Sequence, residues 1–149
     1  MRISSWLVIA TLVISVAANS GPQASDRFDT VDNAVGRTLR IQEATGDTVL
    51  LYLEANHRFN QRLIDPDNKA PWVMSGNKVC ERTPQGPREC HATTGRWWVQ
   101  GTQLCQQPDD SERNYHECHE LTPGKKVGDT WSQPDGFGGQ MTVSILAKD

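Results

Sequence analysis

Most of the chain consists of short segments in which apolar and polar residues alternate. Leu39 and Ile41 alternate with polar neighbours in one segment, and Met141 and Val143 do so in another. Alternation with a period of two residues predicts β-strands with one buried face. Stretches rich in Gly, Pro, Asn and Asp separate the segments. The pattern therefore predicts about eight short strands joined by turns.

The segment from Ser25 to Gly36 follows a different period. Phe28, Val31 and Val35 recur at helical spacing, and Gly36 supplies a stop signal. A single short N-terminal helix followed by strands indicates a mainly β protein, built as a small antiparallel β-barrel or curled sheet. Closure of such a sheet removes edges that are otherwise exposed.

The first twenty residues differ from the rest of the chain. Arg2 is followed by an uncharged apolar run that ends at Ala18, and the chain then becomes polar. A basic residue, a short apolar core and small residues at its end predict a secretory signal peptide, cleaved after Ala18 or after Ser20. A retained N-terminal anchor is the alternative, although spanning requires about 20 apolar residues. Residues 21–149 then form a single β domain, periplasmic or secreted, with no membrane span after cleavage.

All four cysteines follow the predicted signal peptide, and their number is even. In an oxidising compartment this predicts two disulfides rather than free thiols. Four cysteines allow three connectivities. We favour Cys80 with Cys90 and Cys105 with Cys118, because each pair brackets one turn-rich segment. Each disulfide would add about 3 kcal/mol to the free energy of unfolding by restricting the unfolded chain.

Charge and motifs exclude several classes of function. Fifteen Lys and Arg against eighteen Asp and Glu give a net charge of −3, without a basic stripe along the sequence, so nucleic acid is not an expected partner. No recognised catalytic motif is present, and we expect neither an enzyme nor a cofactor. The glycine-rich segment Asp135–Gly139 precedes a strand pattern instead of a helix, which favours a hairpin turn over a phosphate site.

The segment Tyr115–Glu120, with the sequence YHECHE, raises the question of a metal site. In a strand, His116 and Cys118 face one side and His119 faces the other, so the three cannot bind the same ion. A cysteine in a disulfide also offers no thiolate. The favoured interpretation is a stapled strand, and the alternative is copper or zinc bound by His116, His119 and Glu120, with Glu117 and His91 as further candidates.

Four tryptophans follow the predicted signal peptide. The structural interpretation is that their indoles fill the barrel, with the indole N–H bonded to backbone. The functional interpretation is that some of them contact a ligand or partner. Trp97 and Trp98 must point to opposite sides of a strand, so one of the two is a candidate for an exposed contact. The binding candidates are Trp97, Trp98 and Trp131.

The stretch Gly95–Trp131 carries the patterns G-x-W-x-V-x-G-x-x-L-C and K-V-G-D-x-W, and a V-S-I strand follows it. In these features the chain resembles uncharacterised small exported proteins of Gram-negative bacteria. The matching cysteines are Cys105 and Cys118, whereas Cys80 and Cys90 look like an addition in this sequence. The G-x-W strand is also similar, more distantly, to the first strand of lipocalin-like barrels, including periplasmic proteinase inhibitors. The resemblance implies a barrel and an exported protein, without a ligand or an inhibitory residue.

The sequence thus leads to a function hypothesis with two alternatives. We expect an exported, lipocalin-like β-barrel that binds a small apolar molecule or a periplasmic protein non-covalently. The first alternative is a protein inhibitor or interaction module that acts through its surface. The second is copper or zinc binding through the segment His116–Glu120.

Overall fold

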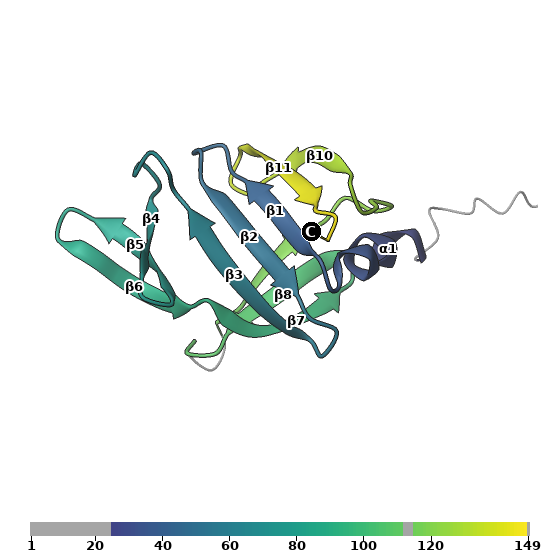
Figure 1. The fold of residues 1–149 in the computed structure, drawn as a ribbon, viewed down its shortest axis with the longest axis horizontal. Coiled ribbons are helices and arrows are strands. Elements are labelled where there is room, and N and C mark those ends of the chain that lie inside the picture. Colours follow the sequence, from purple (N-terminus) through teal and green to yellow (C-terminus); the bar gives the residue numbers. More distant parts are fainter. Residues whose placement is uncertain (1–24, 112–114, 149) are drawn as a thin grey trace, which may run out of the picture.

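The computed structural model describes residues 25–111 and 115–148, and this part contains one helix and eleven strands in two antiparallel sheets (Figure 1). The predicted signal peptide lies outside the described residues. The mainly β fold with a short helix is confirmed. The elements are α1 (Ser25–Ala34), β1 (Thr38–Gln42), β2 (Thr48–Leu53), β3 (Arg58–Ile64), β4 (Trp72–Ser75), β5 (Lys78–Thr83), β6 (Gly86–Ala92), β7 (Thr94–Gln100), β8 (Gln103–Pro108), β9 (Glu117–Glu120), β10 (Thr130–Pro134) and β11 (Gln140–Ile145).

The large sheet has the strand order β10-β11-β1-β2-β3-β7-β8-β9. Strands pair in chain order within the groups β1–β3, β7–β9 and β10–β11, and β11 returns to pair with β1, with Leu39 opposite Ile145. Figure 1 shows β7 and β8 running at a steep angle to β1–β3, because the sheet curls into a half-barrel. The predicted curled sheet is therefore confirmed, and β9 and β10 form its two edges.

The side chain of Gln133 joins these two edges. Its Nε2 donates to the carbonyl oxygen of Glu120 at 2.6 Å, and its Oε1 accepts the backbone N–H of Thr122 at 3.1 Å. The same oxygen accepts the indole N–H of Trp131 at 2.7 Å. Gln133 is only 5% exposed, so water has little access to satisfy its hydrogen-bond partners if the side chain is removed. One buried amide thus links β10 to the segment that follows β9.

Helix α1 covers one end of the half-barrel. The hydroxyl of buried Thr30 donates to the carbonyl oxygen of Thr122 at 2.7 Å and accepts the backbone N–H of Lys125 at 3.0 Å. The amide of Asn33 donates to the carbonyl oxygen of Lys125 at 2.9 Å. Ala34 is fully buried in the core. The helix is therefore fastened to the segment after β9 and closes this end of the barrel.

The core lies inside the half-barrel, toward α1. Phe59 on β3 packs over Gly95, its partner on β7. A Cβ added to Gly95 would lie 2.1 Å from the carbonyl oxygen of Gln107 and 2.6 Å from the Phe59 ring, so only glycine fits at this place. The remaining buried apolar side chains include Val31, Leu39, Leu51, Leu53, Trp97, Leu104, Leu121, Trp131, Met141, Val143 and Ile145.

Strands β4, β5 and β6 form a separate small sheet inserted between β3 and β7. The predicted disulfide Cys80–Cys90 joins β5 to β6, and Cys105–Cys118 joins β8 to β9. The small sheet is tied to the loop after β8 by Asp110, which pairs with the Lys78 ammonium at 2.6 Å. Both predicted pairings are confirmed. In the described ranges no helix has the length and apolar character needed to cross a bilayer.

Gly36, the predicted helix stop, and the segment 135–139, the predicted turn, follow the sequence expectation. Gly36 and Gly128 both have positive φ, and their N–H groups donate to the carbonyl oxygens of Leu53 and Ile145 just before β1 and β10 begin. The segment 135–139 is the hairpin turn between β10 and β11. Its Asp135 carboxylate accepts backbone N–H groups within the turn, as the turn interpretation requires.

We predict that Gln133→Ala lowers the free energy of unfolding by about 2–4 kcal/mol, because it leaves buried donors and an acceptor without partners. Urea denaturation with the disulfides intact measures this loss. The matched control is Gln42→Ala, an exposed position on β1, where we expect a change within about 0.5 kcal/mol. Equal effects of the two substitutions would show that the Gln133 amide does not hold the edges together.

Candidate functional site

At the end of the half-barrel away from α1, the inward-facing positions become polar. Glu43 lies two residues after Ile41 and continues the inner face of β1. Glu117 on β9 is opposite Gln106, which is opposite the buried Trp97, so Glu117 also faces inward. His119 faces inward in the same way. Asp47 and Asp135 lie in two turns at the same end. We call the four carboxylates Glu43, Asp47, Glu117 and Asp135 the acidic mouth.

The carboxyl of Glu43 interacts electrostatically with charged groups from the turns and from β9. Burial raises its pKa most, and repulsion from Asp47 and Asp135 raises it further. Attraction to His119 lowers the pKa, and Glu117 adds a weaker repulsion. Strands β1 and β9 have four other strands between them in the sheet order. Their charges meet only because the sheet curls.

Asp47 is the most deeply buried member of the mouth, with 1% of its surface exposed. Within the described part of the chain, its Oδ2 has no hydrogen-bond partner. Burial raises the pKa of Asp47 most, followed by repulsion from Asp65, whereas a hydrogen bond from Thr45 and the charge of Arg82 act in the opposite direction. A buried carboxylate oxygen without a donor destabilises the charged form. The mouth therefore contains an acceptor that lacks a protein partner.

Glu117 is the best-stabilised carboxylate of the mouth. Its pKa is lowered, first by the hydrogen bond with His119 and then by that with Tyr115, against the opposing effect of burial. The His119 Nε2 lies 3.6 Å from the Glu117 carboxylate, and the Tyr115 hydroxyl donates to the same carboxylate. Burial and Glu117 together raise the pKa of the Tyr115 hydroxyl. The Tyr115 ring stacks on His91 of β6 at a centroid distance of 4.6 Å, which joins the small sheet to this side of the mouth.

A hollow of about 210 Å³ adjoins the Asp47 side of the mouth, between β3 and the small sheet. Asp65, which raises the pKa of Asp47, lies on its wall and pairs with Arg82 at 2.7 Å. Arg82 also donates to the carbonyl oxygen of Ala70, so it fixes the loop between β3 and β4. The apolar part of the wall consists of Leu63, Val73 and Met74.

The structure does not bring together the residues of the predicted metal site. His119 faces inward, whereas His116 and Glu120 occupy the opposite face of β9. Glu120 accepts the hydroxyl of Thr102 at 2.6 Å. In residues 25–111 and 115–148, no three His, Cys, Asp or Glu side chains are arranged to hold a metal ion. The segment is a stapled strand, as the favoured interpretation predicts.

Two of the three tryptophan candidates lie in the core. Trp97 and Trp131 are 6% and 8% exposed, and their indole N–H groups donate to the carbonyl oxygen of Glu54 and to the side chain of Gln133. Trp98 lies on the outer face, half-buried, with its ring 5.5 Å from that of His116. Of the three, Trp98 is the one placed to contact a partner, and that role stays a prediction.

Sequence reasoning did not single out Glu43, Asp47 or Asp135. Each adjoins a strand end in a turn, which is a weak signal, since many acidic residues occupy such positions. The pairing of β1 with β2 and with β11 brings these three together, and the curl of the sheet adds Glu117 and His119 from β9. Comparison with known proteins gave no match to a family model, to a curated protein or to a solved structure.

We predict that Glu43→Gln stabilises the protein at neutral pH. Because the pKa of Glu43 is raised on folding, its favourable contribution is present below the ordinary glutamate pKa and is lost as the pH rises through the folded pKa. Removing the charge should raise the Tm by roughly 2–4 °C at pH 7. The gain should vanish near pH 3, where both forms are neutral.

Glu117→Gln is the matched control, since the pKa of Glu117 is lowered instead. Its substitution should reduce the Tm at pH 7 or leave it unchanged, and this effect should fade as the pH falls. Thermal unfolding between pH 3 and pH 7 measures both variants. A loss of stability in Glu43→Gln at pH 7 would contradict the assigned repulsion.

Proposed function

We propose that this protein is an exported binding module whose acidic mouth receives a basic side chain of a protein partner. The role is binding rather than catalysis. The two disulfides support a protein that works in an oxidising compartment, periplasmic or extracellular. The predicted signal peptide agrees with this proposal.

The observation that carries the proposal is the convergence of carboxylates whose charged forms the protein does not fully stabilise. Glu43 and Asp47 both have raised pKa values, and the Oδ2 of Asp47 has no hydrogen-bond donor in the described residues. Such an arrangement lowers the stability of the free protein at neutral pH. A bound cation reverses the sign of these interactions, because it attracts the same charges that repel one another.

A basic side chain fits this site better than a metal ion does. Metal coordination requires several ligands at one point, and no such group is present in the described ranges. A lysine or arginine needs one or two carboxylates for its head and apolar surface for its stem. The hollow beside the mouth offers that apolar surface through Leu63, Val73 and Met74.

The expectation of a small apolar ligand receives less support. The inner positions toward α1 are occupied by large side chains such as Phe59 and Trp97. Small barrels with filled interiors have no room for an apolar molecule. A protein partner is therefore the favoured occupant of the mouth.

The test is isothermal titration calorimetry of the folded, disulfide-bonded protein with hexalysine as the probe. At low ionic strength we expect binding that the double variant Glu43→Gln/Glu117→Gln weakens by about tenfold, equivalent to about 1.4 kcal/mol. Binding should also weaken as the pH falls. Because the pKa of Glu43 is raised, the loss should begin at a higher pH than an ordinary glutamate would give.

The matched control is Asp32→Asn/Glu54→Gln, which removes two charges outside the mouth. Asp32 lies on α1, and Glu54 lies in the turn after β2. We expect less than a twofold change for this variant. Equal weakening in both double variants would mean that hexalysine responds to net charge alone, and it would overturn the mouth as the binding site.

A further inference from the structure

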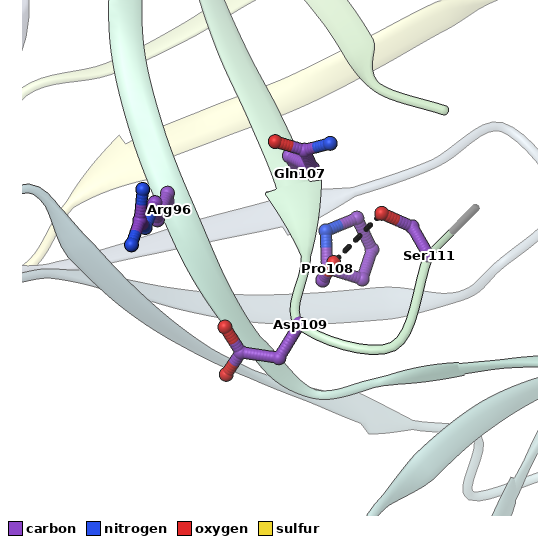
Figure 2. Close-up of a pocket in the computed structure, with 5 residues that line it drawn as sticks. All are labelled: Arg96, Gln107, Pro108, Asp109 and Ser111. Carbon is purple, nitrogen blue, oxygen red and sulfur yellow. Dashed lines mark hydrogen bonds between the residues drawn. The ribbon is translucent and has the colours of Figure 1, made fainter. Parts of the chain in front are cut away.

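A second feature lies on the outer wall, where β7 and β8 pair. It is an open hollow of about 240 Å³, lined by Arg96, Gln107, Pro108, Asp109 and Ser111 (Figure 2). Arg96 and Gln107 are cross-strand partners, and both face outward because the next residue on β7, Trp97, is buried in the core. Figure 2 shows the two side chains extending from neighbouring strands. They line the hollow from paired positions on β7 and β8.

The Asp109 carboxylate in this hollow already has a cationic partner, Arg58. Arg58 donates to both oxygens of Asp109, from Nη1 at 2.7 Å and from Nη2 at 2.5 Å, and the Thr94 hydroxyl donates to Oδ2 at 2.9 Å. Arg96 makes no hydrogen bond or ion pair among the described residues and acts on Asp109 only through its charge. Since Arg58 compensates Asp109, the charge of Arg96 remains uncompensated.

The basic character continues across the wall. Arg62 on β3 and Arg40 on β1 are exposed and occupy outward positions in register, with Leu50 of β2 between them. None of the outward positions within β1, β2, β3 and β7 is Asp or Glu. We call this surface the basic wall. The wall also carries the apolar side chains of Tyr52 and Ile64, which are 37% and 38% exposed to solvent.

We propose that the basic wall binds an acidic segment of a protein partner, with one carboxylate held by Arg96 and Gln107 in the hollow. Arginine grips a carboxylate through two parallel N–H donors, and a neighbouring amide adds a third donor. Arginine and tyrosine are also enriched among the residues that dominate protein interfaces. This surface is separate from the acidic mouth and has the opposite charge.

A protein segment suits this wall better than other anionic partners. The outside of a curled sheet is convex, so a flat bilayer touches few of its strands at once. Nucleic acid sites neutralise many phosphates with closely spaced Lys and Arg, whereas the exposed arginines named on this wall are Arg40, Arg62 and Arg96. A peptide can follow the curvature, and its apolar residues can cover Tyr52 and Ile64.

The test measures binding of acetylated hexaglutamate to the folded protein by calorimetry at low ionic strength. We expect Arg96→Gln to weaken binding by about fivefold or more, and Arg40→Gln/Arg62→Gln to weaken it by about threefold or more. Arg96 faces Arg58 across the β3–β7 pair, so removing one of two like charges is not expected to unfold the protein. Thermal unfolding of each variant checks this point.

The control is Arg88→Gln, which removes one exposed arginine from β6, in the small sheet. Its affinity for hexaglutamate should change by less than about 1.5-fold. Inorganic phosphate, vesicles with anionic lipid and a single-stranded oligonucleotide serve as competing probes. No binding of hexaglutamate, equal binding by Arg96→Gln and Arg88→Gln, or stronger binding to vesicles or to the oligonucleotide would each overturn the proposal.

The two proposals are distinguishable because their probes have opposite charge. Arg96→Gln should leave hexalysine binding at the mouth unchanged or slightly stronger. Glu43→Gln/Glu117→Gln should not weaken hexaglutamate binding at the wall. If the mouth variant weakened both probes equally, the basic wall would not be a separate site, and this inference would fail.

Discussion

The arrangement of this molecule depends on one buried amide. An open antiparallel sheet of eight strands leaves two edges, and here the side chain of Gln133 connects them through the backbone of Glu120 and Thr122. The hydroxyl of Thr30 then ties α1 to the same segment. Once the edges are held near each other, the inner face becomes an interior. Without that connection, Glu43 and Glu117 would lie on strands that four other strands separate, rather than in one site.

The interior is divided along its length. Near α1 it is apolar and filled, and Gly95 shows how closely the parts fit, since no Cβ can be accommodated there. At the other end the same strands present carboxylates inward. On the outer face, β1, β3 and β7 carry arginines. The alternation that defines a strand thus places Glu43 and Glu117 inside and the arginines of β1, β3 and β7 outside, although the protein as a whole is only mildly acidic.

The sequence predicted what depends on neighbours along the chain. Alternation located most strands, the bracketed turns favoured the pairings Cys80–Cys90 and Cys105–Cys118, and the strand pattern after the 135–139 segment favoured a hairpin turn there. Contacts between distant segments were not predictable. The bond from Gln133 to Glu120, the convergence of Glu43 with His119 and the compensation of Asp109 by Arg58 all depend on how the sheet curls. The disulfide of Cys118 within Tyr115–Glu120 was predicted correctly. The proximity of Glu117 to Glu43 was not, because no local sequence pattern links these two residues.

The mouth is bordered by short hairpin turns, among them residues 43–47 and 135–139. Turns of this kind tolerate changes in length at small cost, because the entropy of closing a loop grows slowly with its size. The filled end near α1 has no such freedom. Related chains could therefore deepen or reshape the mouth by lengthening these turns while the rest of the barrel stays unchanged, so that new recognition properties evolve independently of the part that keeps the protein folded.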